Sequence, residues 1–184
     1  DPDTDAGGRV LEGLALESLA KRDVIIYSGH SGPFYGFALA NWKKTDEGDL
    51  DDADIRVAPM PADRYQIVLA EGCDTYQIGT AFKENPSKAG QNVDVITTTS
   101  FSDASSPASV ENFVAALLAR DSLQRLRPQP VSGLLTRLDS ASYGFTSMYG
   151  MHGIDDNPKL VPWAQAAKRA RPRARPGIRT CWVS

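Results

Sequence analysis

Cysteine and histidine are scarce in this sequence, which contains two of each among 184 residues. The two cysteines lie more than a hundred positions apart and do not make a disulfide framework, and no C-x-x-C or H-E-x-x-H spacing of a zinc site occurs. Long apolar runs are also missing, because stretches such as VIIY and IVLA are far shorter than the roughly 20 residues that a membrane-spanning helix needs. We therefore expect a protein without a metal, a cofactor or a membrane span.

What the sequence does contain fits one domain, since 41% of its residues are hydrophobic. Charge is unevenly distributed: TDEGDLDDADIR is acidic, KRARPRARPGIR is basic, and no acidic residue follows Asp156. We assign residues 1–163 to a domain and 164–184 to a basic tail. The tail's composition fits electrostatic binding of nucleic acid, and it also fits a disordered or non-native extension. We favour the second interpretation and expect no nucleic-acid partner.

The acidic stretch falls within residues 34–62, a long polar segment that invites a calcium interpretation. An EF-hand loop counted from Asp49 needs Gly at its sixth position and Glu at its twelfth, but Asp54 and Met60 stand there. We interpret the segment as an active-site or surface loop with one short helix.

Apolar patterns predict alternating helices and strands. Residues 7–22 have leucines at helical spacing and end on two cations, as a helix does. Buried strands are expected within 23–29, 64–74 and 93–103, and further helices over 75–85 and 106–126. This order indicates an α/β fold with a mostly parallel sheet and helices on both of its faces. Ligands of such sheets bind at the carboxyl ends of the strands.

His30 and Cys73 each stand just past the end of an expected strand. The strands ending at Ser28 and Ala70 are expected to be parallel neighbours, which places their ends about 5 Å apart. An imidazole and a helix N-terminus both favour the thiolate, which is the nucleophilic form of cysteine. We therefore expect a catalytic dyad of Cys73 and His30. The alternative is an inert buried thiol and a loop histidine held by hydrogen bonds.

Around these residues the sequence resembles the caspase-like cysteine peptidases, which include caspases, metacaspases, legumains, clostripain and gingipains. In that family one strand ends in a catalytic His, usually followed by Gly, and the next ends in a catalytic Cys within motifs such as Q-A-C-R-G or E-A-C-E-S-G. The counterparts here are VIIYSGHSG and YQIVLAEGCD, and His30 precedes Cys73 by 43 positions, near the roughly 50 of caspases. The resemblance covers about residues 10–120. It implies a three-layer caspase-like fold and a thiol protease that hydrolyses proteins or peptides.

The resemblance also implies an oxyanion hole made by backbone N–H groups after the His and at the Cys. Ser31 follows His30 where Gly is usual, and Gly32 comes next. Because backbone donors do not strictly require Gly, the expected donors are Ser31, Gly32 and Cys73. His152, in YGMHGIDDNP, is a rival general base. We prefer His30, because His152 follows the Cys in a stretch rich in Gly, Tyr and Met that we interpret as a loop.

Glu71 stands two residues before Cys73, where the family places a residue of the pocket for the side chain before the cleaved bond. A poorly solvated carboxylate favours a cation, which predicts cleavage after Arg or Lys. Legumains also carry Glu there and prefer Asn, so Asn stays an alternative. TTSFSDASS resembles a legumain stretch and offers Ser100, Asp103 and Ser105 as the other pocket wall. Turn formation and helix capping explain these three residues equally well.

Two strands and a helix precede the His-bearing strand of a caspase-like sheet, but only about 20 residues precede it here. We expect an associated N-terminal fragment of the same precursor to complete the sheet, because an open apolar edge invites aggregation. Two alternatives to an active endopeptidase remain. One is a caspase-like fold that has lost activity and serves as a binding or scaffold module, and the other is a nucleic-acid adaptor that binds through the basic tail.

Overall fold

The computed structural model describes residues 1–32, 36–88, 91–103, 106–142 and 148–153. The chain divides into two units, Asp1–Ile154 and Asp155–Ser184, and every described residue lies in the first. The expected basic tail at 164–184 and the candidate pocket residue Ser105 lie outside the described residues. Within the described ranges, none of the helices is both long enough and apolar enough to cross a bilayer.

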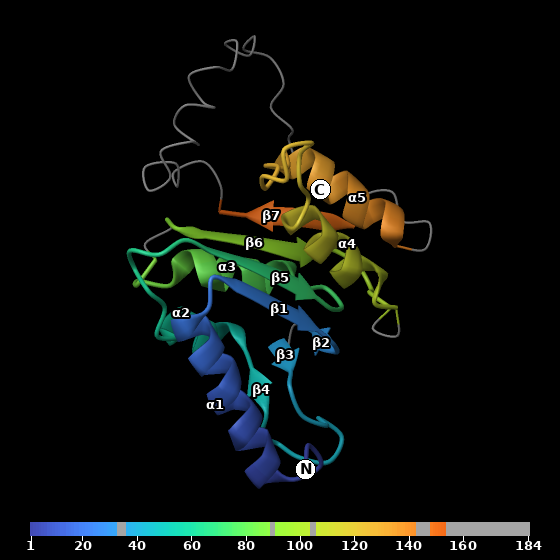
Figure 1. Ribbon diagram of the computed structural model, residues 1–184. Coiled ribbons are helices and arrows are strands. Elements are labelled where there is room, and N and C mark those ends of the chain that lie inside the picture. The colour runs from blue at the N-terminus through green and yellow to red at the C-terminus, as the bar shows by residue number, and fades with distance from the viewer. Residues whose placement is uncertain (33–35, 89–90, 104–105, 143–147, 154–184) are drawn as a thin grey trace. The chain divides into compact units, whose positions relative to one another are not determined.

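A four-stranded sheet in the order β1-β5-β6-β7 forms the centre of the first unit (Figure 1). Its strands are β1 (Val24–Ser28), β5 (Gln66–Glu71), β6 (Val93–Thr98) and β7 (Tyr149–His152). The first three are parallel, and β7 runs antiparallel to β6. The prediction of a mostly parallel sheet is confirmed. So is the predicted pairing of the first two strands, in which Tyr27 lies opposite Ala70.

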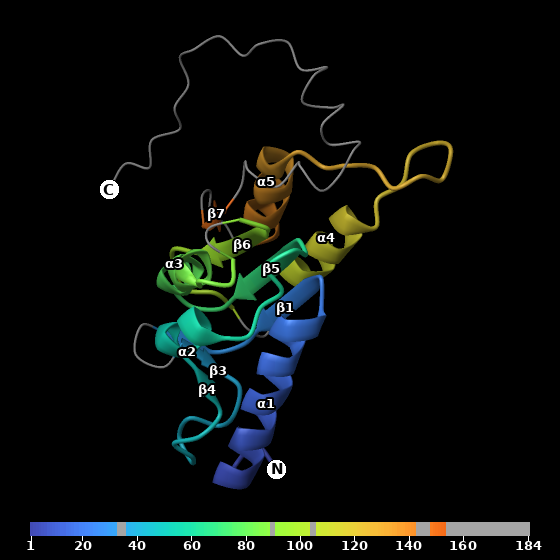
Figure 2. The same ribbon diagram turned by 90° about the vertical axis from the view of Figure 1, so that its left-hand side faces the viewer.

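Helices flank both faces of this sheet, as the sequence predicted (Figures 1 and 2). One face carries α1 (Asp5–Lys21), α2 (Asp52–Val57) and α3 (Tyr76–Glu84), and the other carries α4 (Ala108–Leu117) and α5 (Val131–Ala141).

The alternation of side chains along β5 explains the two cores. Val68 and Ala70 enter the core that α1 to α3 complete, whereas Leu69 enters the core of α4 and α5. Because residues two apart share a face, Glu71 lies on the same side of the sheet as Leu69. The last residue of β5 therefore faces the side of α4 and α5.

Four expectations from the sequence are wrong. The helix expected over 106–126 ends at Leu117, and the chain then makes a turn in which Arg120 pairs with Leu126. The side chain of Asp121 accepts backbone hydrogen bonds within that turn and so competes with a helix.

The stretch around His152 is not a loop but β7, because pairing with β6 outweighs the low strand propensity of its glycine.

The segment 34–62, expected to be a polar loop, contains the predicted short helix, α2, but also two strands that were not predicted, β3 (Gly36–Ala38) and β4 (Asp49–Leu50). These form an antiparallel sheet with β2 (Ser31–Gly32), which precedes the segment. Strands of two or three residues are too short to leave a periodic pattern in the sequence.

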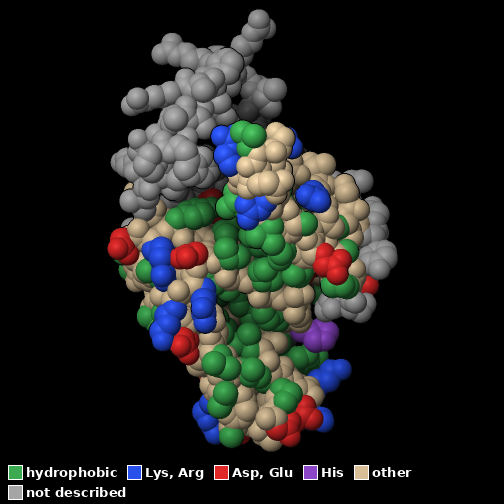
Figure 3. All heavy atoms as spheres, in the orientation of Figure 1, with side chains coloured by type: hydrophobic (Ala, Val, Ile, Leu, Met, Phe, Trp, Pro, Cys, Tyr) green, Lys and Arg blue, Asp and Glu red, His purple; other side chains and the backbone are tan. Residues whose placement is uncertain are grey.

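The fourth correction concerns β1. It was expected to be buried but is an edge strand. Its Val24 and Ile26 side chains are 43% and 37% exposed, and no described strand pairs with its outer side. The N–H of Gly29 donates to the backbone carbonyl of Glu71. Because alternate residues of a strand bond to the same neighbour, the odd-numbered residues of β1 form hydrogen bonds with β5. The N–H and C=O groups of the residues between them therefore point to the open edge. Figure 3 shows hydrophobic side chains gathered over β1 and α4.

Candidate active site

The loops that follow β1 and β5 lie side by side at the carboxyl edge of the sheet. The Gly29 N–H donates to the Glu71 carbonyl over 3.1 Å, and the Ser31 hydroxyl donates to the Cys73 carbonyl over 2.8 Å. A Cβ at Gly72 would lie 2.2 Å from the Ser31 hydroxyl oxygen, so a residue larger than glycine does not fit between the loops. The close approach of the two loops is what places a histidine and a cysteine at one edge.

The side chains of Cys73 and His30 do not contact each other through a hydrogen bond among the described residues. Cys73 is half-buried, and its thiol donates to the Ser102 carbonyl with a sulfur–oxygen distance of 3.7 Å. The His30 imidazole is exposed, while the His30 carbonyl accepts the Ala38 N–H over 3.0 Å. Within the described ranges, no hydrogen bond links the imidazole to the thiol. The structure therefore brings the two loops together without forming the dyad.

Backbone register indicates which of the expected oxyanion donors are available. The carbonyl that precedes Ser31 accepts an N–H from β3, which makes Ser31 and Phe37 a non-hydrogen-bonded pair. The Ser31 N–H therefore points away from β3, whereas that of Gly32 points toward it. The Cys73 N–H makes no hydrogen bond to any described residue. Ser31 and Cys73 are accordingly the better placed donors.

A pocket of about 390 Å³ opens on the side of the sheet that α4 and α5 cover. Its walls come from β5, from the β6–α4 loop and from both helices, and include Glu71, Phe101, Ser102, Asp103, Ser109 and Ser142. Two of the residues expected from the sequence, Glu71 and Asp103, line it together. Ser100 is not among the residues that line it. The pocket adjoins Cys73, because Ser102, which lines it, also accepts the hydrogen bond of the Cys73 thiol.

Glu71 is 3% exposed, and both oxygens of its carboxylate accept hydrogen bonds from hydroxyl groups. Ser102 donates to one oxygen, and Tyr149 donates to the other over 2.6 Å. The Tyr149 hydroxyl also contacts Ser109 over 2.6 Å and Ser142 over 3.3 Å. Burial and the neighbouring carboxylate raise the pKa of Tyr149, which keeps it a neutral donor. In the part of the chain that the structure describes, no lysine or arginine pairs with Glu71.

Two residues that contact Glu71, Tyr149 and Ser102, were not predicted from the sequence. Tyr149 lies 78 positions beyond Glu71 on a strand that the sequence did not predict, so no local pattern connects the two. Ser102 lies within the stretch singled out as a pocket wall, where Ser100 was named instead. Choosing between those two serines requires the direction of each side chain after the strand ends, which residue spacing does not give.

His152, the rival general base, lies on the other face of the sheet. Its ring packs against Gly79 and against Tyr76, with the two ring centroids 4.6 Å apart. Burial and the charge of Lys83 lower the pKa of His152, and its Nε2 is buried without a hydrogen-bond partner among the described residues. Tyr149, three positions earlier on β7, faces the side of α4 and α5 instead and contacts Glu71 there. The prediction that prefers His30 is therefore retained.

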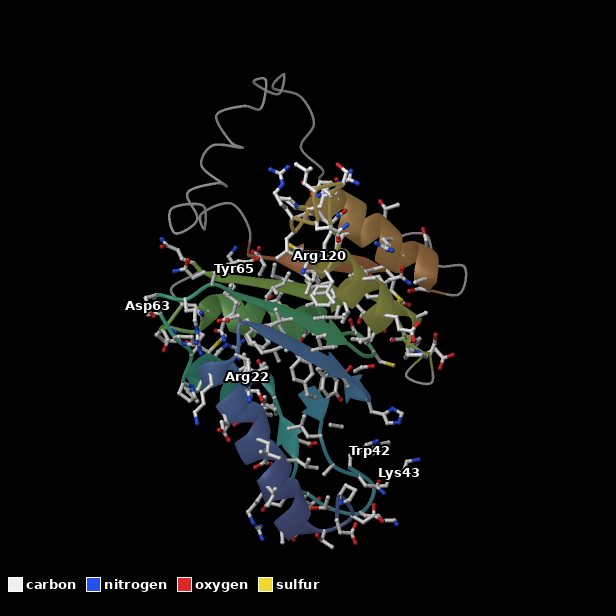
Figure 4. The ribbon with its side chains drawn as sticks, in the orientation of Figure 1. Arg22, Trp42, Lys43, Asp63, Tyr65 and Arg120 are labelled. Carbon is white, nitrogen blue, oxygen red and sulfur yellow. The ribbon has the colours of Figure 1, made fainter. Side chains whose placement is uncertain are left out.

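A second buried ionisable group, Lys88, lies where the parallel strands begin. Figure 4 places Tyr65 in this region, at the start of β5 and away from the carboxyl edge. Lys88 is 2% exposed, and its Nζ donates to the carbonyls of Pro61, Arg64 and Asn92. Burial and the charge of Arg64 lower the pKa of Lys88 to about 8. Since three carbonyls use its three protons, this lysine is a structural anchor.

The described ranges contain no group of three or more His, Cys, Asp or Glu side chains that could hold a metal ion. No family model, no curated protein and no solved structure matches this chain. Any function must therefore be argued from the chemistry of the site itself.

Proposed function

We propose that the protein is a cysteine endopeptidase that cleaves peptide bonds after Arg or Lys. The observation that supports this most strongly is the Glu71 carboxylate, which is buried, lacks a cationic partner among the described residues and lines a pocket beside Cys73. Burying a carboxylate without a cation is costly. A guanidinium or ammonium group supplied by a substrate compensates that cost, and Asp103 adds a second carboxylate to the same pocket.

In the proposed reaction the Cys73 thiolate attacks the carbonyl carbon of the scissile bond and forms a C–S bond. The N–H groups of Ser31 and Cys73 stabilise the oxyanion of the tetrahedral intermediate. The C–N bond then breaks as His30 donates to the leaving amine the proton that it took from the Cys73 thiol. Water attacks the thioester carbonyl as His30 accepts a proton from it, and the C–S bond breaks to release the carboxylic acid and the Cys73 thiolate.

This reaction requires His30 to turn its exposed side chain toward the Cys73 thiol. The backbone contacts on either side of His30 keep its loop against the loop of Cys73. Catalytic hydrogen bonds are often long or poorly aligned before substrate binds and tighten only in the complex.

The second candidate function is a binding module that recognises a cationic side chain without cleaving the chain that carries it. It is favoured by the position of the Cys73 thiol, which lies against the Ser102 carbonyl and makes no hydrogen bond to His30. The rate of alkylation by iodoacetamide at neutral pH separates the two functions. A thiolate primed by His30 reacts much faster than free cysteine, and a packed thiol reacts more slowly.

Fluorogenic peptides that vary the residue before the cleaved bond test the proposal. We expect cleavage after Arg and Lys, and a loss of activity in Cys73→Ala. The variant His30→Ala should lose about 100-fold or more in kcat, because general acid–base catalysis typically contributes that much. His152→Ala is the matched control and should keep its activity. Cleavage that survives in Cys73→Ala would end the assignment of the nucleophile.

A further inference from the structure

Phe101 is 79% exposed, although it is a large aromatic residue, and it lines the same pocket as Glu71. A single exposed apolar residue is ordinary on a protein surface. The setting of this ring is different, because it forms one wall of a pocket whose other side carries a buried carboxylate. The pocket therefore combines an apolar flat surface with a negative charge.

The position of Phe101 is fixed by its two neighbours in the loop between β6 and α4, at the carboxyl edge of the sheet in Figure 1. The Ser100 carbonyl accepts the backbone N–H of the residue after Cys73 over 3.0 Å. Ser102 accepts the Cys73 thiol through its carbonyl and donates its hydroxyl to Glu71. The loop segment that carries Phe101 is thus held against the loop of Cys73 and against Glu71.

We propose that Phe101 is a specificity-determining residue that stacks on a substrate arginine whose guanidinium pairs with Glu71. This inference rests on the proposed function, since it assigns a wall of the same pocket. A guanidinium is planar and weakly hydrated and stacks on aromatic faces, whereas an ammonium is compact and strongly hydrated. The aliphatic part of the arginine side chain also shields the Phe101 ring from water. The pocket consequently prefers Arg to Lys.

Binding to the inactive variant Cys73→Ala tests this inference without depending on catalysis. The probes are Nα-acetylarginine amide, Nα-acetyllysine amide and the neutral Nα-acetylmethionine amide, with the dissociation constant followed by NMR titration. We expect Phe101→Ala to weaken the arginine probe about fivefold or more, in line with an exposed to partly desolvated cation–π contact. Phe101→Leu keeps an apolar contact for the aliphatic part of the probe's side chain. It should therefore lower mainly the preference for the arginine probe over the lysine probe.

Val57→Ala is the matched control, because Val57 is also 79% exposed but lies on α2, which packs on the other face of the sheet. It should leave all three dissociation constants unchanged. An arginine affinity that Phe101→Ala does not alter overturns the inference, even if the wild-type protein cleaves after Arg. Conversely, binding of arginine that depends on Phe101 upholds it even if the wild-type protein cleaves nothing, in which case the proposed peptidase function fails alone.

Discussion

Glu71 illustrates what a single residue contributes to this site. Its place two positions before Cys73 can be read from the sequence, because both residues belong to one short motif. Its environment cannot be read in this way, since the hydroxyl groups that hold it come from the β6–α4 loop and from β7. The two hydroxyl groups orient the carboxylate but do not neutralise it. The negative charge is therefore the feature that a substrate cation would use.

The substitution Glu71→Gln removes that charge with little change in shape. Removing one partner of a desolvated charged pair typically costs about 2–5 kcal/mol, so kcat/KM for cleavage after Arg should fall at least about tenfold. The rate of Cys73 alkylation by iodoacetamide should stay nearly the same, because the thiol does not contact Glu71. The matched control is Glu111→Gln, which removes a charge from the exposed surface of α4.

Two results would contradict this expectation. In the first, Glu71→Gln and wild-type protein cleave Arg, Asn and Asp substrates equally well, which removes the carboxylate from substrate recognition. In the second, Glu111→Gln reduces cleavage as much as Glu71→Gln does. The effect would then be one of net charge, not of the pocket.

At the scale of helices and strands, the sequence predicted the elements that carry strong periodic patterns. The strands that end before His30 and Cys73 contain the apolar runs VIIY and IVLA, and their parallel pairing was predicted from the alternation of such runs with helical segments along the chain. The strands β2, β3 and β4 could not be predicted, because they are too short for a pattern. The strand β7 owes its conformation to pairing with β6, which is a tertiary effect.

Lys88 connects the loops at the opposite end of the sheet, and its titration makes the free energy of unfolding depend on pH. Its pKa is lowered to about 8 in the folded protein, whereas an unfolded chain has the ordinary lysine value near 10.4. Between these two values the unfolded state binds more protons, so the free energy of unfolding should rise with pH. We expect a rise of about 2 kcal/mol between pH 7.5 and 9.5, measured by urea unfolding.

The variant Lys88→Met removes the titrating group and should flatten this dependence, besides lowering stability by the loss of three hydrogen bonds. The range stops at about pH 9.5 because Tyr65 and Tyr149 have raised pKa values in the folded state and destabilise it at higher pH. Stability that falls between pH 7.5 and 9.5 in the wild-type protein would contradict the account of Lys88.

For the molecule as a whole, the open side of β1 is the feature that the sheet leaves unpaired among the described residues. Val24 and Ile26 are exposed there, and Val114 of α4 and Leu118, which directly follows α4, are 36% and 62% exposed. An unprotected apolar edge is a template for pairing with another strand. A fragment that supplies a further strand would cover this edge.

Without such a fragment, we expect the chain to self-associate through β1, and Ile26→Lys should lower the associated fraction. A lysine on an edge strand opposes pairing with a further strand. Light scattering over a range of protein concentrations measures the effect. Val57→Lys, which places the same charge on α2, should leave association unchanged. If Ile26→Lys associates as the wild-type protein does, β1 is not the surface involved.

The central claim is that Cys73 is a nucleophile served by the Glu71 pocket, and covalent labelling tests it most directly. The measurement is the rate of labelling by peptidyl acyloxymethyl ketones that carry Arg or Asp before the reactive carbonyl, with the modified residue identified by mass spectrometry. The account predicts a single adduct on Cys73 and labelling by the Arg probe at least about tenfold faster than by the Asp probe, a preference that Glu71→Gln abolishes. An adduct on Cys181 alone, or equal rates for the two probes in wild-type protein, would contradict it.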